Sequence, residues 1–180
     1  MDHRRLKSER VYSGRLLKID RDRVRLPNGH EAELEMVRHP GAAAVVPFVT
    51  AGEVLLVRQF RYAAGGFILE VPAGTLRPEE TPEDCARREM EEEVGHRAGR
   101  LSHLASIYTT PGFTDEIIHL YAAYDLTPAA QHLDQDEVLS VELLTLVSAC
   151  ERIHLGEIVD AKSICTLLLV SRLDVGRAPG

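Results

Sequence analysis

The sequence is poor in aromatic residues and cysteines, and the spacing of its few cysteines argues against zinc sites and redox motifs. It has no tryptophan, and aromatic residues make up 5% of its 180 positions. Its three cysteines, Cys85, Cys150 and Cys165, are widely spaced and form no CxxC pair. Because structural zinc sites and redox motifs use closely spaced cysteines, we expect neither here. We expect all three thiols to be reduced, in a cytoplasmic protein.

Positive charge and long apolar runs are also scarce. The chain has 21 Lys and Arg residues against 28 Asp and Glu residues, a formal net charge of -7. Such a surface does not broadly attract a nucleic-acid backbone, so we expect no nucleic-acid partner. The apolar runs are too short to span a bilayer, and the N-terminal segment MDHRRLKSER lacks the apolar region of a secretory signal. We therefore expect no membrane association.

The apolar residues follow the patterns of strands first and helices later. Residues 15–26 and 31–37 alternate around Pro27-Asn28-Gly29, which predicts a β-hairpin. Further strands are predicted at residues 42–49, 53–60, 67–71, 101–108, 117–124 and 138–146, and helices at residues 146–156 and 161–173. This order favours an α/β (α+β) fold with a mixed sheet over a doubly wound parallel sheet. We expect an N-terminal β-hairpin region at residues 1–40 and the main domain at residues 41–180.

One segment, residues 74–96, gathers carboxylates around a predicted helix: GTLRPEETPEDCARREMEEEVGH. Thr81 is a good N-cap, Pro82 fits the first helical position, and Gly95 supplies the end. Glu83 and Asp84 suit the positive end of the helix dipole. Ala86, Met90 and Val94 recur at helical spacing, which predicts a stripe of side chains facing a core.

Helical spacing also sorts the carboxylates of this segment. Glu89, Glu92 and Glu93 share the side next to the apolar stripe, and Arg88 can neutralise and orient Glu92. Glu91 points elsewhere and is expected to be solvated. The alternative is a solvated acidic face, but like charges at this spacing cost about 0.2–0.5 kcal/mol per pair. Since Mg²⁺ binds a few carboxylates together with substrate phosphates and water, the segment predicts a magnesium site.

The offsets within this segment resemble the full signature of the Nudix hydrolases. The matching residues are Gly74, Glu80, Arg88, Glu89, Met90, Glu92, Glu93 and Gly95. His96 departs from the pattern, because the family usually has an aliphatic residue there. The resemblance implies an α/β/α sandwich that hydrolyses a diphosphate linked to another group.

The resemblance also implies roles for residues of the segment. Mg²⁺, with Mn²⁺ as a substitute, would be held by Glu89, Glu92, Glu93 and the backbone carbonyl of Ala73. Arg88 would orient the carboxylates, and Glu80 would support the loop before the helix. Cys85 is expected to be a packing residue.

We call residues 74–96 the Nudix box. Segments outside this box resemble the ADP-ribose pyrophosphatase branch of the family. They are TPGFTDE at residues 110–116, VRHPGA at 37–42, VRQFR at 57–61 and LEVPAG at 69–74. For the first of them an ordinary Pro-Gly turn is the alternative. The branch implies hydrolysis of ADP-ribose to AMP and ribose 5-phosphate, and N-terminal strands that exchange between subunits of a homodimer and help to form the substrate pocket.

Other functions remain open at this point. One is hydrolysis of other nucleoside diphosphate sugars, such as GDP-mannose. Another is a non-catalytic ADP-ribose sensor that regulates transcription, but the intact box and the short chain do not favour it. An isopentenyl-diphosphate isomerase would have an altered box and a different cysteine environment.

The residues expected at the substrate are taken from the branch-like segments. They are Arg38, Arg58, Arg61, Glu70, Pro111 and Glu116. Guanidinium groups suit phosphate oxygens, although surface salt bridges are the alternative for each arginine. The resemblance places Glu116 at a ribose hydroxyl. Adenine would stack on a tyrosine, a phenylalanine or an arginine.

The acidic loop LDQDE at residues 133–137 bears on the general base. Glu137 matches an acidic residue that binds metal or water in relatives, whereas Gln135 stands where some relatives carry the catalytic glutamate. An amide cannot accept a proton usefully at neutral pH. Either Glu137 or a box glutamate, Glu92 or Glu93, therefore acts as the base, and a merely solvated acidic loop is the alternative.

Overall fold

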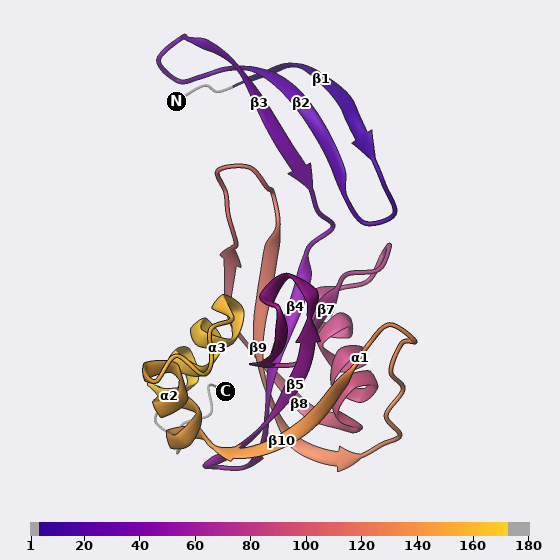
Figure 1. Ribbon diagram of the computed structural model, residues 1–180, viewed down its shortest axis with the longest axis vertical. Coiled ribbons are helices and arrows are strands. Elements are labelled where there is room, and N and C mark those ends of the chain that lie inside the picture. Colours follow the sequence, from indigo (N-terminus) through magenta and orange to yellow (C-terminus); the bar gives the residue numbers. More distant parts are fainter. Residues whose placement is uncertain (1–3, 173–180) are drawn as a thin grey trace. The chain divides into compact units, whose positions relative to one another are not determined.

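The computed structural model describes residues 4–172, and the chain divides into two compact units. The first unit is Met1–Gly41 with Tyr108–Ile117, and the second is Ala42–Ile107 with Ile118–Gly180. Figure 1 labels most of the elements of both units, each of which is described separately below.

The first unit is a three-stranded antiparallel sheet in the order β1-β2-β3. The strands are β1 (Arg4–Ser13), β2 (Lys18–Arg25) and β3 (Glu31–Arg38). The predicted hairpin is confirmed as β2–β3, and Gly29 adopts a φ of 84° in its turn. β1 was not predicted, because its sequence RRLKSERVYS lacks a clear alternation and two bulges interrupt its pairing with β2.

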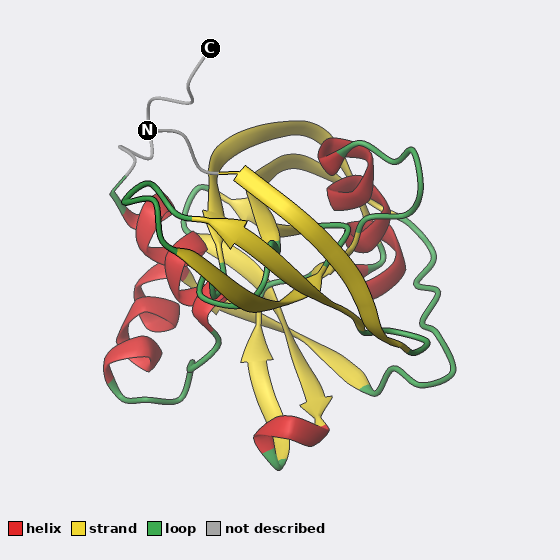
Figure 2. Cartoon of the chain, turned by 90° about the horizontal axis from the view of Figure 1, so that it is seen from above, coloured by secondary structure: helices red, strands yellow, loops and turns green. Residues whose placement is uncertain are grey.

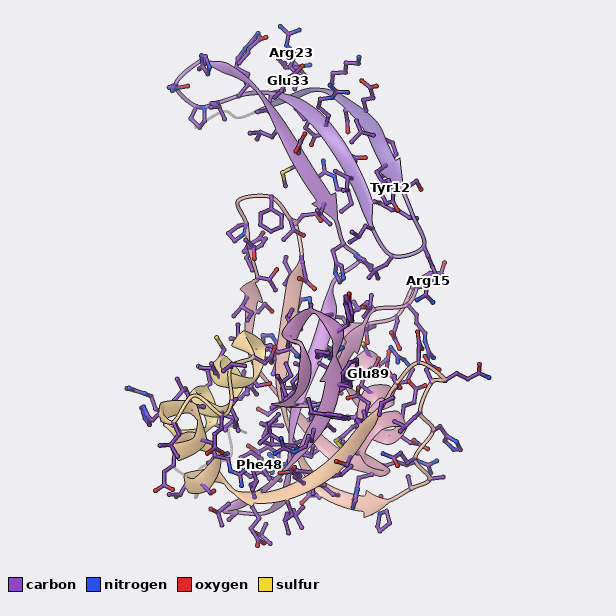
Figure 3. All side chains as sticks on the ribbon, in the orientation of Figure 1. Tyr12, Arg15, Arg23, Glu33, Phe48 and Glu89 are labelled. Carbon is purple, nitrogen blue, oxygen red and sulfur yellow. The ribbon has the colours of Figure 1, made fainter. Side chains whose placement is uncertain are left out.

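Charged side chains cover much of this sheet, as Figure 3 shows around the labelled Arg23 and Glu33. Arg23 and Arg25 both donate to Glu31, each with a contact of 2.8 Å. On the alternate positions of β2, Asp20 and Asp22 are buried. The 108–117 segment joins β3 through backbone bonds in which Val37 N–H donates to Phe113 and Asp115 N–H donates to Val37.

The second unit contains a seven-stranded mixed sheet. Its strands are β4 (Ala42–Thr50), β5 (Glu53–Arg61), β6 (Gly66–Glu70), β7 (Ala73–Thr75), β8 (His96–Tyr108), β9 (Ile117–Pro128) and β10 (Leu139–Thr145). The main path runs β10-β5-β4-β9-β8, while β6 pairs with β5 and β7 pairs with β4. β4 and β9 are parallel, whereas β4 is antiparallel to β5 and β7. The expected mixed sheet is therefore confirmed.

Helices pack on both faces of β4 because its side chains alternate between two cores. Ala44 and Val46 join one core with Leu146, Leu167 and other residues of α2 (Leu146–His154) and α3 (Ala161–Ser171). Ala43 packs in the other core, against α1 (Pro82–Val94). Figures 1 and 2 show the sheet between α1 and the α2–α3 pair. The expected α/β/α sandwich is confirmed.

The predicted elements recur with shifted ends. β8 begins at His96 instead of residue 101, and the last helix ends at Ser171; its predicted end at residue 173 lies outside the described residues. The short strand β7 and the 3-10 turn η1 (Tyr62–Ala64) were not predicted. No helix within residues 4–172 has the length and apolarity needed to cross a membrane.

Candidate active site

The carboxylate-rich segment forms α1 with the predicted ends. Thr81 Oγ1 accepts a hydrogen bond from Asp84 N–H at 3.1 Å, and Pro82 is the first helical residue. Gly95 adopts the left-handed conformation, with a φ of 67°, and its N–H closes the last turn on Glu91. The helix start and end predicted from the sequence are both confirmed.

One side of α1 buries two glutamates beside its apolar stripe. Ala86 and Met90 are fully buried, and Glu93 is 1% exposed. Glu89 is 7% exposed, and Figure 3 labels it on α1. Burial of such carboxylates carries a cost in free energy unless a cation or hydrogen-bond donors reach them.

Glu91 is accessible to solvent, as expected, and it also has a partner. Its two carboxylate oxygens accept from Arg97 at 2.7 and 2.8 Å in an exposed pair. Helical spacing alone does not show that β8, which starts directly after the helix, places an arginine beside it.

Arg88 is the cation at the centre of this carboxylate group. It donates to both oxygens of Glu80, at 2.7 and 3.0 Å, and to Glu92 Oε2 at 2.8 Å. It also donates to Glu89 and to the Thr75 carbonyl. The hydrogen bonds from Arg88 are the main cause that lowers the pKa of Glu80 to about 2. Hydrogen bonds to Glu80 are in turn the largest effect that raises the Arg88 pKa.

A second arginine, from the loop before the helix, reaches the same carboxylates. The Arg77 N–H donates to Glu80 at 2.9 Å, which fixes the loop backbone. Its guanidinium donates to Glu92 Oε1 at 3.2 Å. Each oxygen of Glu92 is therefore bonded to an arginine, one to Arg77 and the other to Arg88.

Glu89 and Glu93 face the strand β7 and its glycine. Ala73 N–H donates to Glu93 Oε2 at 3.0 Å. A Cβ added at Gly74 would lie 1.7 Å from Glu89 Oε1, so any side chain at this position would displace the Glu89 carboxylate. Burial is the largest effect on the pKa of both carboxylates, and it raises the pKa of Glu89. At Glu93, burial and the charge of Glu89 together raise the pKa to about 8.

The segment that leads from β9 into the acidic loop is attached to the last turn of α1. Ala129 N–H donates to the Gly95 carbonyl at 2.7 Å, and His132 N–H donates to the Glu92 carbonyl at 3.0 Å. The Gln131 side chain donates to the Glu93 carbonyl at 2.6 Å. These bonds satisfy carbonyls that a helix end otherwise leaves without partners.

Glu137, at the end of this loop, contributes to the field around the helix. Its charge helps to raise the pKa values of both Glu89 and Glu93. Its Oε2 accepts from Asp134 N–H at 2.9 Å, which closes a turn within the loop.

A buried ion network continues from the end of β6. Glu70 is 1% exposed and accepts two hydrogen bonds from Arg61, at 2.7 and 3.0 Å. Lys162 of α3 also donates to Glu70, and it lies 3.0 Å from Asp160. The hydrogen bond to Glu70 is the largest effect on the Arg61 pKa and raises it, whereas burial lowers it. The negative charge of Glu93 also helps to raise this pKa. Sequence patterns missed Lys162, because a lysine at the start of an apolar helix carries no distinctive signal.

The remaining residues expected at the substrate have partners of their own. In the second unit, Arg58 is bonded to Glu142 of β10. In the first unit, Arg38 donates to Asp20 and Asp115, each at 3.0 Å, and to Asp22.

The loop that contains Pro111 also belongs to the first unit. Phe113 N–H donates to the Thr110 carbonyl at 3.1 Å, which closes a turn around Pro111. Glu116 Oε2 accepts from the Thr109 hydroxyl at 2.8 Å, and His39 Nδ1 lies 3.5 Å from Glu116 Oε1. The structure thus brings Arg38, Pro111 and Glu116 into one unit, and the box residues, Arg58, Arg61, Glu70 and Glu137 into the other.

The donor set suits a hard divalent cation, although its side chains are not yet arranged as a metal site. Within residues 4–172, no group of three or more His, Cys, Asp or Glu side chains already has a geometry that could hold a metal ion. Arginines donate hydrogen bonds to Glu92, and a backbone N–H donates to Glu93. Carboxylate oxygens are nevertheless ligands of the type that Mg²⁺ prefers. Two of the carboxylates, Glu89 and Glu93, are buried and have raised pKa values.

Comparisons with known proteins show which family the chain resembles. A family model described as NUDIX domain matches residues 37–167, and one described as nucleoside diphosphate sugar hydrolase N-terminal domain matches residues 4–33. An ADP-ribose pyrophosphatase of Bacillus subtilis (strain 168) is 38% identical, over 91% of this chain and 89% of that protein. A methanol dehydrogenase activator of Bacillus methanolicus is 41% identical, over the same 91% and 89%.

Two more distant matches extend the comparison. A GDP-mannose pyrophosphatase of Cronobacter sakazakii (strain ATCC BAA-894) is 35% identical over 74% of this chain and 78% of that protein. A solved structure, described as an ADP compounds hydrolase, superposes with a TM-score of 0.84. The superposition covers 95% of this chain and 93% of that one at 24% identity, which establishes the likeness of fold. With the box in place on α1 and a family model spanning most of the chain, this protein belongs to the Nudix hydrolase family.

Proposed function

We propose that this Nudix enzyme hydrolyses the pyrophosphate bond of ADP-ribose to AMP and ribose 5-phosphate, with Mg²⁺ as cofactor and Mn²⁺ as a substitute. The observation that carries the chemistry is the buried pair Glu89 and Glu93 beside Glu92 on α1. The substrate follows from relatives that are named ADP-ribose pyrophosphatase and align over nearly the whole chain.

The box residues have distinct proposed roles in this reaction. Glu89, Glu92, Glu93, Glu137 and the Ala73 carbonyl are the proposed metal ligands. Bound Mg²⁺ would offset charge that develops on the pyrophosphate oxygens and lower the pKa of a bound water. Arg88 keeps Glu92 and Glu89 in place, because its guanidinium is itself fixed by two hydrogen bonds to Glu80.

We assign the general base to Glu137, with Glu92 or Glu93 as the alternative. Glu137 is close enough to influence the pKa values of Glu89 and Glu93, and the attachment of its loop to α1 supports this assignment. A base must lie within hydrogen-bond reach of the attacking water, directly or through one other water. The Gln135 amide cannot take this role.

For the substrate, we propose that Arg61 binds phosphate oxygens. Glu70 holds its guanidinium through two hydrogen bonds, and Lys162 stabilises Glu70 in turn. This support leaves the Arg61 donors that do not face Glu70 available for phosphate, since a guanidinium carries five N–H groups. Arg58 has a lesser role, because its guanidinium already pairs with Glu142.

The first unit contributes the other proposed substrate contacts. They are Arg38, the loop around Pro111, and Glu116, which is proposed to accept a hydrogen bond from a ribose hydroxyl. Arg38 donates hydrogen bonds to three aspartates, so its main proposed role is to fix the position of these carboxylates. It could bind the substrate only through an N–H group that one of the aspartates releases.

The proposed organisation is a cytoplasmic homodimer without nucleic-acid or membrane partners. The N-terminal region, residues 1–40, would serve dimerisation and the pocket, and residues 41–180 would form the hydrolase domain. The separate family model on residues 4–33 supports this division. Gel filtration at working concentration should give a dimer, and a monomer would contradict it.

The deciding experiment is a substrate panel. Purified protein with Mg²⁺ or Mn²⁺ should be offered ADP-ribose, GDP-mannose and other nucleoside diphosphate sugars, and phosphate counted after coupling to a phosphatase. We expect the highest kcat/KM on ADP-ribose, with AMP and ribose 5-phosphate as products. A higher kcat/KM on GDP-mannose would favour the second candidate, which the GDP-mannose pyrophosphatase relatives support.

The same assay can locate the base. Glu137→Gln should lower kcat much more than it raises KM, because an amide of the same shape keeps the contacts but cannot accept the proton. An unchanged kcat would assign the role to a box glutamate.

A further inference from the structure

Glu92 is the box carboxylate that arginines hold from both sides. Its Oε2 accepts from Arg88 at 2.8 Å and its Oε1 accepts from Arg77 at 3.2 Å. A cation that binds Glu92 through one of these oxygens competes with the arginine bonded to it, because both seek the same lone pairs. The two arginines differ in how easily they can leave.

Arg88 is mostly buried and has several partners, whereas the Arg77 side chain is mostly exposed. The Arg88 side chain is 16% exposed and donates to four further groups besides Glu92, among them both oxygens of Glu80. The Arg77 side chain is 58% exposed, and its bond to Glu92 spans the loop and the helix. A long exposed side chain regains rotamer freedom when it leaves such a pair.

We propose that Arg77 is a displaceable counterion that occupies Glu92 in the metal-free protein and is released when a divalent cation binds there. This inference rests on the proposed metal role of Glu92.

The consequence is a lower affinity for the metal than the carboxylates alone would give. Exposed ion pairs are worth little, so the competition should weaken divalent-cation binding only about two- to fivefold. Arg77 thereby sets the metal concentration at which Glu92 becomes a ligand.

The chain offers a matched control at Arg97. Its side chain is 68% exposed and pairs with Glu91 on the same helix, at 2.7 and 2.8 Å. Glu91 is not a proposed ligand. Arg77→Gln and Arg97→Gln therefore remove the same charge from exposed pairs on α1, but only the first frees a proposed metal ligand.

The test is the binding of Mn²⁺ alone to the full chain, measured by electron paramagnetic resonance without substrate. Arg77→Gln should tighten Mn²⁺ binding about two- to fivefold, whereas Arg97→Gln should leave it unchanged. The gain should shrink in concentrated salt, because salt screens exposed pairs. Unchanged or weaker binding in Arg77→Gln would overturn the proposal, as would an equal gain in Arg97→Gln.

A double-mutant cycle separates displacement from long-range charge effects. Glu92→Gln should weaken Mn²⁺ binding, and adding Arg77→Gln to it should give no further gain, because the shared carboxylate is gone. An undiminished gain would overturn the displacement. If Glu92→Gln leaves Mn²⁺ affinity unchanged, the proposed metal set itself fails; if only the Arg77 effect is missing, the metal set stands and the counterion role does not.

Discussion

The first unit surrounds one arginine with acids, whereas the second unit buries more acid than its arginines neutralise. Arg38 donates hydrogen bonds to three aspartates. The pKa of Asp20 is lowered by Arg10 and Arg38. At Asp22 burial raises the pKa, but hydrogen bonds outweigh burial and the pKa is lowered. On α1, burial is the largest effect and raises the pKa values of Glu89 and Glu93.

Charge balance, more than residue type, therefore distinguishes the aspartate cluster around Arg38 from the proposed metal ligands on α1. The residues around Arg38 and those around Arg88 both combine arginine with Asp or Glu side chains at hydrogen-bond distance. A lowered pKa marks a carboxylate whose charge the fold already stabilises, and a raised pKa marks one whose charge it does not.

The largest expected effect is the loss of catalysis in Glu93→Gln. We expect kcat to fall by about two to three orders of magnitude, since a ligand acting on charge in the transition state is removed. The metal-free protein should keep its stability, because the raised pKa of Glu93 means that the fold favours the neutral form. Hydrolysis assays and urea unfolding measure the two quantities.

Glu91→Gln is the matched control for this change. Glu91 lies on the same helix and pairs with Arg97, so its loss should leave kcat nearly unchanged. Equal losses of kcat in both variants would mean that spacing had not separated the metal ligands from the other glutamates.

The next effect is on stability, in Arg38→Ala. Removing this arginine takes a charged partner from buried Asp22 and leaves buried Asp20 with Arg10 alone, which should cost about 3 kcal/mol of unfolding free energy. Arg23→Ala, which breaks an exposed pair with Glu31, should cost less than about 1 kcal/mol. Urea denaturation followed by circular dichroism compares them.

The opposite pattern would break the comparison between the two units. If Arg38→Ala keeps its stability and instead raises the KM for substrate, Arg38 serves the ligand more than the sheet. The first cluster would then be a binding site and not a structural one.

A smaller, pH-dependent effect is expected for Glu80→Gln. The pKa of Glu80 is lowered to about 2 by Arg88, so its ionised form stabilises the fold above the ordinary value of 4.5. This stabilisation, about 1–3 kcal/mol for a charge-assisted bond, is lost as the pH falls from 4.5 toward 2. The difference between the two proteins in urea midpoint should be constant near pH 7 and shrink near pH 3. A constant difference down to pH 3 would rule out the assigned cause.

Much of the fold and of the box could be predicted because their signals are local. The cap at Thr81, the end at Gly95 and the spacing of the glutamates all lie within one segment, and α1 has the predicted bounds. The continuous apolar run of β4 likewise predicts a strand buried on both faces.

The remaining features depend on partners that are distant in the sequence. The three aspartates of Arg38 come from β2 and the loop that contains Asp115, and the Glu70 partners come from β5 and α3. The Glu91 partner, Arg97, likewise lies beyond the end of the helix. No periodicity within one element encodes such pairs.

The attachment of residues 129–132 to the last turn of α1 has a consequence for synthesis of the chain. α1 has 13 residues and no basic side chain in its last turn, and isolated helices shorter than about 12–15 residues are marginal in water. Its terminal carbonyls acquire Ala129, Gln131 and His132 as donors only when that later segment has left the ribosome. The glutamates of the box are translated early, but the helix that carries them is completed late, so a nascent chain that stops before this loop would hold the signature without a settled site.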